Sequence, residues 1–123
     1  MTRYRGLTLR VLAKSAAAMG PGKAELIEHI ARTGSISAAA RAMGMSYRRA
    51  WLLVDALNED FADRVVVTST GGQRGGGASV TPFGRALTSR FRAMEAKASA
   101  AIDADVRYLT GLLKRGARRR KAR

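Results

Sequence analysis

Two adjacent arginines, Arg48 and Arg49, are the residues best suited to specific chemistry in this sequence. Each guanidinium can donate two parallel hydrogen bonds to O6 and N7 of guanine, or it can pair with a phosphate. Tyr47, just before them, offers a hydroxyl for a base or backbone contact, or a ring for packing. Ser46 can cap a helix that begins here, which sets all three side chains in its first turn. We therefore predict that residues 46–49 contact nucleic acid.

The whole chain carries a large excess of positive charge. Its 23 Lys and Arg residues outnumber 9 Asp and Glu residues, which gives a net charge of +14. Such an excess predicts a polyanionic partner: nucleic acid, an acidic membrane face or an acidic protein. Residues 114–123 contain seven cations and no acid, so they hold half of the net charge. We expect this segment to be a disordered basic tail, either a solubilising tail or a phosphate-binding arm.

Length and composition favour one folded domain over residues 1–113. A chain of 123 residues, 46% of them hydrophobic, can build a single core. It contains no Cys and only one His, which argues against thiolate metal sites and a Ser-His-Asp triad. No apolar run is long enough to cross a bilayer, and the N-terminus leads into no signal-peptide core. We expect a soluble cytoplasmic protein without a cofactor or a metal.

The first part of the chain is predicted to contain a short strand and then a helix. Residues 7–12 begin with alternating apolar and polar side chains and end in an apolar pair, which favours a strand. Residues 15–20 are a link of small residues. Pro21 suits the first turn of a helix, and Gly34 is placed to end it.

Two helices separated by a tight turn follow, and the second carries the arginines. Ser35 and Ser46 can each cap a helix, and Gly44 ends the first one. The first helix has an apolar stripe at helical spacing, formed by Ile36, Ala39, Ala40 and Met43. The second helix, over residues 46–61, has a stripe formed by Ala50, Leu53, Val54, Leu57 and Phe61, with Trp51 at its border. This pattern is typical of a helix-turn-helix, whose second helix enters the DNA major groove.

Phosphate contacts are predicted at the start of the first helix of this motif. Ser35 and Ser37 head that helix, whose N–H groups and dipole can hold a phosphate. Arg41 is exposed on the same helix. It can contact the DNA backbone or remain a solvated charge.

A hairpin with a glycine-rich tip is predicted next. Residues 65–67 and 79–81 read as its strands, and residues 70–78 form the tip. The hairpin resembles a wing beside the helix-turn-helix. Within the tip, Gln73 and Arg74 are candidates for phosphate or minor-groove contacts, unless the tip is simply mobile.

A long amphipathic helix is predicted from Pro82, with Thr81 as its cap. Its 21 residues up to Ile102 span about 31 Å, which exceeds the core of so small a domain. Its apolar seam is expected to pair with a second copy and consists of Leu87, Phe91, Met94, Ala98 and Ile102. Asp103 and Asp105 suit a fresh helix start, so we predict a bend there. The predicted fold class is therefore mostly α with a small β-hairpin wing and a long C-terminal dimerisation helix.

Four motifs occur in a characteristic order. They are Gly34-Ser35-Ile36-Ser37-x-Ala39-Ala40, Gly44-Met45-Ser46-Tyr47-Arg48-x-Ala50-Trp51, Asn58, and Gly71-Gly72-x-x-Gly75-Gly76-Gly77-Ala78-x-Val80-Thr81-x-x-Gly84. Over roughly residues 6–105 the chain resembles the N-terminal DNA-binding domain of the ModE family, the molybdate-responsive transcription regulators. More distantly, it resembles the helix-turn-helix of LysR-type regulators. The ModE resemblance implies a winged helix-turn-helix homodimer, joined through the long helix and part of the N-terminal region, on an inverted-repeat operator.

The chain departs from the ModE pattern beyond the winged helix. ModE regulators carry C-terminal oxyanion-binding domains, and no β-rich segment after the long helix can build one here. We therefore expect no molybdate site in this chain.

Two functions remain open for a basic winged helix. One is a sequence-specific dimeric transcription regulator, and the other is a sequence-tolerant architectural protein that binds DNA mostly through the tail and wing. They differ in how affinity depends on sequence and on salt. An enzyme has only the glycine loop in its favour, and that loop lacks the Gly-Lys-Ser/Thr of a phosphate-binding P-loop.

Overall fold

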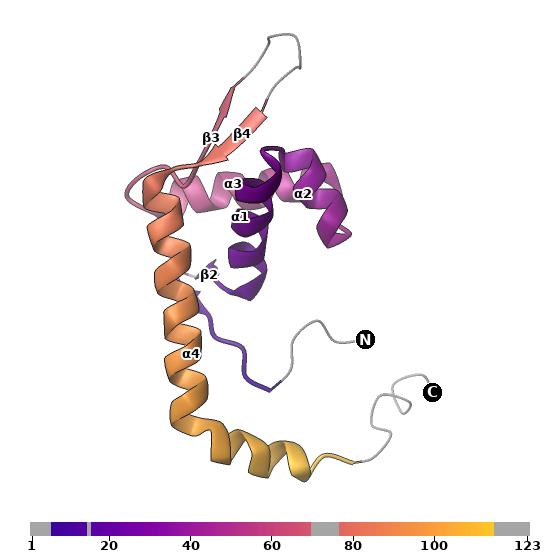
Figure 1. Cartoon of the computed structure of the whole chain (residues 1–123), viewed down its shortest axis with the longest axis vertical. Coiled ribbons are helices and arrows are strands. Elements are labelled where there is room, and N and C mark those ends of the chain that lie inside the picture. Colours follow the sequence, from indigo (N-terminus) through magenta and orange to yellow (C-terminus); the bar gives the residue numbers. More distant parts are fainter. Residues whose placement is uncertain (1–5, 15, 70–76, 115–123) are drawn as a thin grey trace.

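The computed structural model describes residues 6–14, 16–69 and 77–114. Two short strands lead into three helices, an antiparallel hairpin and a long final helix (Figure 1). The elements are β1 (Val11–Leu12), β2 (Ala17–Met19), α1 (Pro21–Thr33), α2 (Ile36–Met43), α3 (Tyr47–Asp60), β3 (Val66–Ser69), β4 (Gly77–Val80) and α4 (Pro82–Gly111). Within the described ranges, no helix combines the length and apolar character needed to cross a bilayer. The predicted fold class, a mostly helical winged helix-turn-helix with a long C-terminal helix, is confirmed.

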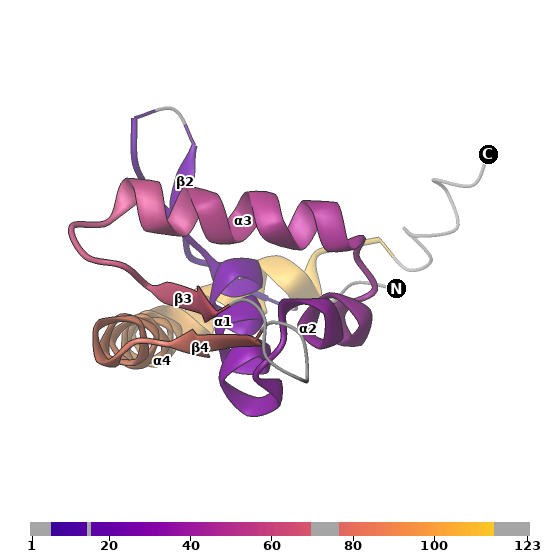
Figure 2. The ribbon, with the colours of Figure 1, turned by 90° about the horizontal axis from the view of Figure 1, so that it is seen from above.

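The helix-turn-helix is built by the residues that the sequence assigned to its caps. Gly34 and Gly44 end α1 and α2 with φ values of 71° and 70°, in the left-handed region that favours glycine. Ser35 and Ser46 cap the following helices, and each Oγ accepts a backbone N–H from three residues ahead at 3.0 Å. Seen from above, α1 packs against both α2 and α4, and α2 packs against α3 (Figure 2).

Small side chains let α2 and α3 approach closely. Ala39, Ala40 and Ala50 are at most 2% exposed. Larger aliphatic side chains fill the rest of the core and contribute about 1.5–3 kcal/mol each through burial. The largest of them are Leu26, Ile27, Ile30, Val54, Leu57, Val65 and Val66. The two predicted apolar stripes are confirmed, with Leu53 and Phe61 half buried at the edge of the core.

The hairpin is anchored to the helices at two places. β3 and β4 pair antiparallel over all four residues of each strand. Asn58 Oδ1 accepts the N–H groups of Val65 and Val66 at 2.7 and 3.2 Å, and its Nδ2 donates to the Val66 carbonyl at 3.0 Å. On the other strand, the Ala78 N–H donates to the Gly34 carbonyl at 2.9 Å. These bonds fix the wing relative to both α3 and the start of α2.

The N-terminal hairpin corrects the prediction for this part of the chain. Only Val11–Leu12 of the predicted strand 7–12 are in strand conformation, and they pair with Ala17–Met19 inside the predicted link. A run of alanines carries no strand signal of its own, because side-chain packing decides much of β-structure. Ala18 and Met19 are 6% and 2% exposed, and β2 contacts α3. Burial therefore orders this segment where local propensity does not.

Helix α4 begins at the predicted cap. Thr81 Oγ1 accepts the Gly84 N–H at 2.9 Å and donates to the Arg64 carbonyl at 2.6 Å, while Pro82 occupies the first turn. Gly84 permits the close approach to the segment before β3. A Cβ at this position would lie 2.5 Å from the Val65 carbonyl oxygen.

The first half of α4 packs on its own domain, which corrects part of the predicted seam. Phe91 is 2% exposed and belongs to the core, and Leu87 packs against that core. Ala98 is half buried, whereas Met94 and Ile102 are 36% and 38% exposed. Helical periodicity marks an apolar face, but it does not distinguish contact with the same domain from contact with a second copy.

Helix α4 bends at Ile102, as predicted. The φ of −121° and ψ of 20° at this residue are not helical, and the segment beyond runs in a new direction (Figure 1). Asp103 lies at the start of that segment and pairs with Arg107 at 3.0 Å. The segment exposes four large side chains at 63–69%: Tyr108, Leu109, Leu112 and Leu113.

Candidate nucleic-acid interface

The first turn of α3 presents polar and charged side chains to solvent. Tyr47, Arg48 and Arg49 are all exposed. Ser46 Oγ accepts the Arg49 N–H, so its hydroxyl hydrogen is free to donate to an outside acceptor. Within the described part of the chain, no carboxylate forms a salt bridge with either arginine. This turn therefore offers two guanidinium groups that no described acidic residue neutralises.

The order of charges along α3 is the reverse of the one that stabilises a helix. The helix dipole favours acidic side chains at the N-terminus and basic ones at the C-terminus, by about 0.3–1 kcal/mol per charge. Helix α3 has no acid in its first turn and no base in its last. Arg48 and Arg49 lie at its start, and Glu59 and Asp60 lie at its end. The arginines do not stabilise their own helix, which fits a role in contacting an outside anion.

Tyr47 packs against a neighbouring ring on one side and is exposed on the other. Its ring packs edge-on against Trp51, with centroids 6.2 Å apart and planes at 83°. Trp51 is half buried and borders the core, as predicted. Tyr47 is nevertheless 54% exposed, so its position is held from one side while the other remains open to a ligand.

The start of α2 brings a second set of predicted residues beside the wing. Ser35 and Ser37 are half buried, and Arg41 is exposed. Arg41 Nη1 donates to Ser37 Oγ at 3.3 Å, so the guanidinium lies along its own helix. Because the Gly34 carbonyl accepts the Ala78 N–H, this helix start lies next to the first residues of β4. The wing-tip candidates Gln73 and Arg74, and the tail beyond Lys114, lie outside the described residues.

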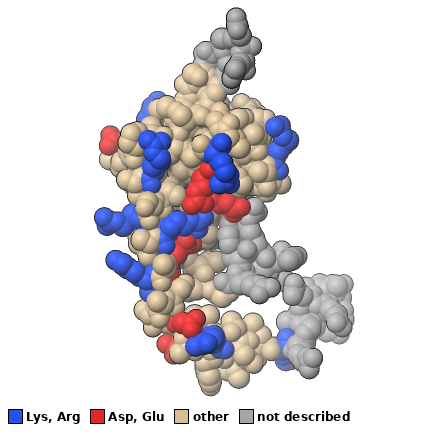
Figure 3. Space-filling view, in the orientation of Figure 1, with Lys and Arg blue, Asp and Glu red and all other residues tan. Residues whose placement is uncertain are grey.

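One arginine, Arg92, forms hydrogen bonds with two glutamates where α1 and α4 meet. Arg92 donates to Glu28 through Nε and Nη2 at 3.0 and 2.8 Å, and to Glu95 through Nη1 at 2.8 Å. The hydrogen bond from Arg92 lowers the pKa of Glu28 against the opposing effect of desolvation. Figure 3 shows Lys and Arg side chains over the globular part and along α4 on this face. Two of the molecule's nine Asp and Glu side chains are thus paired with this arginine.

The single histidine, His29, contacts side chains of its own helix, α1. His29 Nδ1 lies 2.9 Å from Arg32 Nη2, and its Nε2 lies 3.7 Å from a carboxylate oxygen of Glu25. Among the residues that the structure describes, no three His, Cys, Asp or Glu side chains are grouped so that they could hold a metal.

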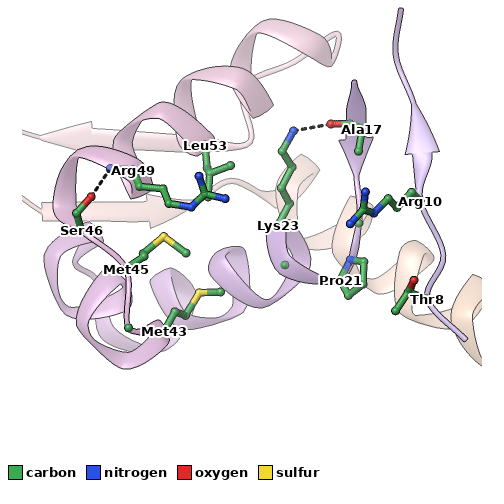
Figure 4. Close-up of a pocket in the computed structure, with 13 residues that line it drawn as sticks. Thr8, Arg10, Ala17, Pro21, Lys23, Met43, Met45, Ser46, Arg49 and Leu53 are labelled. Carbon is green, nitrogen blue, oxygen red and sulfur yellow. Dashed lines mark hydrogen bonds between the residues drawn. The ribbon is translucent and has the colours of Figure 1, made fainter. Parts of the chain in front are cut away.

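A cavity beside α3 gathers residues that the sequence did not connect. Its volume is about 730 Å³, and it lies between the N-terminal hairpin, the start of α1 and the turn before α3 (Figure 4). Arg10 and Lys23 line it together with Ser46 and Arg49. Arg10 and Lys23 belong to residues 1–23, which hold five cations and no acid, and no motif in the sequence connects the two. Their common position depends on the packing of the N-terminal hairpin, which the sequence did not predict.

Residues 22–85 match the sequence model of a family described as bacterial regulatory helix-turn-helix protein, lysR family. The chain belongs to this family. The matched region of this lysR-family chain runs from the start of α1 to the start of α4, so it contains both the helix-turn-helix and the wing.

This lysR-family chain is also similar to three curated proteins over about 70% of its own length. It is 48% identical over 86 residues to the molybdenum-pterin-binding protein MopB of Rhodobacter capsulatus, covering 70% of this chain and 32% of MopB. It is 36% identical over 86 residues to the molybdenum transport protein ModE of Azotobacter vinelandii, with the same coverage. It is 38% identical over 85 residues to the DNA-binding transcriptional dual regulator ModE of Escherichia coli K12, covering 69% of this chain and 32% of that protein. The predicted resemblance to the ModE DNA-binding domain is confirmed, and the chain spans about a third of the length of these relatives.

One solved structure supports the fold of this lysR-family chain. The structure titled as a complex of the CbnR DNA-binding domain with DNA superposes with a TM-score of 0.53 at 20% identity. It covers 68% of this chain and 91% of that one. At this identity the likeness concerns the fold alone.

Proposed function

We propose that this chain is a sequence-specific DNA-binding transcription regulator. The observation that carries the proposal is the exposed first turn of α3, where Arg48 and Arg49 have no acidic partner among the described residues. In a helix-turn-helix this turn faces base edges in the major groove. The names of the E. coli relative and of the matching family, a DNA-binding regulator and regulatory helix-turn-helix proteins, support the same function.

The proposed complex divides its contacts between bases and backbone. Arg48 and Arg49 donate to guanine O6 and N7, or one of them pairs with phosphate, and Tyr47 adds a base or backbone contact. The remaining candidates position the protein on the backbone or in the minor groove: Ser35, Ser37, Arg41, Ser46, Gln73 and Arg74. Phosphate contacts fix the register of the protein, and base contacts carry the sequence preference.

We further propose that two copies bind an inverted repeat. Met94 and Ile102 remain exposed on α4, and the segment beyond the bend exposes four large side chains at 63–69%. A second copy that covers these residues would place two α3 helices on one side of a duplex. Their half-sites would then lie about 34 Å apart, one helical turn.

A sequence-tolerant architectural protein is the second candidate, and the charge of +14 favours it. Phosphate-driven binding loses affinity steeply with salt and hardly depends on sequence. The two functions therefore predict different results for the same protein.

Selection of bound sequences from a random DNA pool tests the proposal. A regulator enriches a palindromic motif, and it binds that motif about 10³-fold or more tightly than a scrambled duplex at physiological salt. An architectural protein enriches no motif, and its two affinities stay nearly equal at every salt concentration.

A further inference from the structure

The cavity beside α3 has the volume of a small-molecule site. Its volume of about 730 Å³ lies within the range of ligand pockets, roughly 300–1,000 Å³. Its walls come from four parts of the chain: the N-terminal hairpin, the start of α1, the α2–α3 turn and α3 itself (Figure 4). These walls include part of the turn that we propose reads DNA.

Three cations converge on this cavity from separate elements. Figure 4 shows Arg10 and Arg49 directed toward it from opposite sides, with Lys23 between them. Lys23 Nζ donates to the Ala17 carbonyl at 2.7 Å and keeps two further protons to donate. The described lining contains no Asp or Glu, and none of the three cations forms a salt bridge with a described carboxylate. Like charges that face one shared space repel each other, and an anion between them removes that repulsion.

Apolar side chains complete the lining. Met43 and Pro21 are buried, and Met45 and Leu53 are half buried around the cavity. A fully hydrated inorganic ion offers no apolar surface to this part of the lining. A ligand with an anionic group and an apolar body satisfies both parts of the wall, since ligand pockets typically combine apolar walls with a few placed polar groups.

We propose that this cavity binds a small organic anion, a carboxylate or phosphate monoester with an apolar body, and that the bound anion weakens DNA binding by engaging Arg49. The second half of the proposal rests on the proposed DNA-binding function. Arg49 belongs both to the cavity and to the first turn of α3. A guanidinium that is held by the anion cannot bind a base or phosphate of DNA. Binding of the anion and binding of DNA therefore weaken each other.

A nuclear magnetic resonance titration of the whole chain with phenyl phosphate, without DNA, tests the site itself. At constant ionic strength we expect saturable amide shifts at Gly22, Lys23 and Arg49. Inorganic phosphate and benzyl alcohol each lack one half of the ligand, so each should bind at least about tenfold more weakly. Shifts that do not saturate, that lie elsewhere, or that inorganic phosphate reproduces with equal affinity overturn the proposal.

A charge-matched pair of variants assigns the binding to the cavity. Arg10→Ala/Lys23→Ala removes two charge-assisted contacts and should weaken phenyl phosphate binding by about tenfold or more. Arg90→Ala/Lys97→Ala removes two exposed cations from α4 and should leave the affinity within about twofold, because screened surface charges contribute little. If the first pair disturbs the fold, Arg10→Ala alone is used, since Arg10 is exposed. An equal loss of phenyl phosphate affinity in the two double variants overturns the assignment of the site.

The final arm measures DNA affinity with and without phenyl phosphate. The anion should weaken DNA binding by the wild type and have little effect on Arg10→Ala/Lys23→Ala. An unchanged wild-type affinity for DNA overturns the coupling.

If, without the anion, Arg10→Ala/Lys23→Ala loses clearly more DNA affinity than Arg90→Ala/Lys97→Ala, the cavity holds a DNA phosphate and the proposal is wrong. If the wild type binds no DNA at all, the proposed function and the coupling fail, whereas the titration without DNA still decides the anion site.

Discussion

Arginine is used in two different ways at two places in this molecule. Between α1 and α4, Arg92 donates three hydrogen bonds to Glu28 and Glu95 at 2.8–3.0 Å. In the first turn of α3, Arg48 and Arg49 have no described acidic partner and lie at the helix end where the dipole disfavours them. The same side chain thus joins two helices in one region and is kept available in the other. The presence of a nearby carboxylate, rather than the residue type, separates the structural arginine from the proposed functional ones.

Arg48→Ala should have the largest effect and should act on DNA binding alone. We expect a loss of roughly 1–3 kcal/mol in binding free energy, with relaxed preference at one base position, because a bidentate base contact is removed. Competition between the selected duplex and its single-base variants measures this change. Arg90→Ala, an exposed arginine on α4, is the matched control. Unchanged selectivity would remove Arg48 from the reading role.

Ser46→Ala should affect both stability and DNA binding. The substitution removes the cap that accepts the Arg49 N–H, which should lower the free energy of unfolding by about 1 kcal/mol. It also loosens the turn that presents the arginines, so DNA affinity should fall with it. Chemical denaturation and a DNA titration measure the two effects, with the exposed Ser99→Ala on α4 as control. Full stability in Ser46→Ala would contradict the role of the cap.

Arg92→Met should lower stability and leave the sequence preference of DNA binding unchanged. The side chains of Arg92 and Glu28 are each 37% exposed, so solvent screening limits the expected loss to less than about 1 kcal/mol. Methionine keeps most of the aliphatic packing and removes the charge. Denaturant unfolding beside Arg90→Met measures the loss. A change in the selected DNA motif would contradict the assignment of Arg92 to a structural role.

The smallest effect is a pH dependence that originates at Glu28. Because its pKa is lowered below the ordinary value of 4.5, chiefly by the hydrogen bond from Arg92, its stabilising contribution is complete above that value. The contribution disappears as the pH falls through the lowered pKa of the folded state. Unfolding curves between pH 6 and about pH 3 should therefore show a steeper loss of stability in the wild type than in Arg92→Met. Parallel curves would contradict this account.

The sequence predicted helix boundaries correctly where a single capping or helix-ending residue sets the boundary. Gly34 and Gly44 end their helices in the left-handed region, and Ser35 and Ser46 cap the helices that follow. The bend at Ile102 was predictable in the same way, from the aspartates that follow it. Each of these features depends on contacts within a few residues along the chain.

The remaining features depend on which distant segments meet. Strand β2 consists of small residues that become ordered by burial, so its pattern predicted only a link. Phe91 fits the apolar period of α4 equally well as a core residue and as a seam residue, and only its burial in the core decides between them. Arg10, Lys23 and Arg49 share one cavity although they come from separate elements. Periodicity and capping carry no information about such contacts.

Chemical-shift mapping of the selected duplex on the labelled chain tests the central claim most directly. The account predicts that the strongest perturbations among the described residues fall on residues 46–49, with weaker ones at the start of α2. It also predicts that the Glu28–Arg92 contact is unaffected. Perturbations confined to other surfaces, with Arg48 and Arg49 unchanged at saturating DNA, would contradict it.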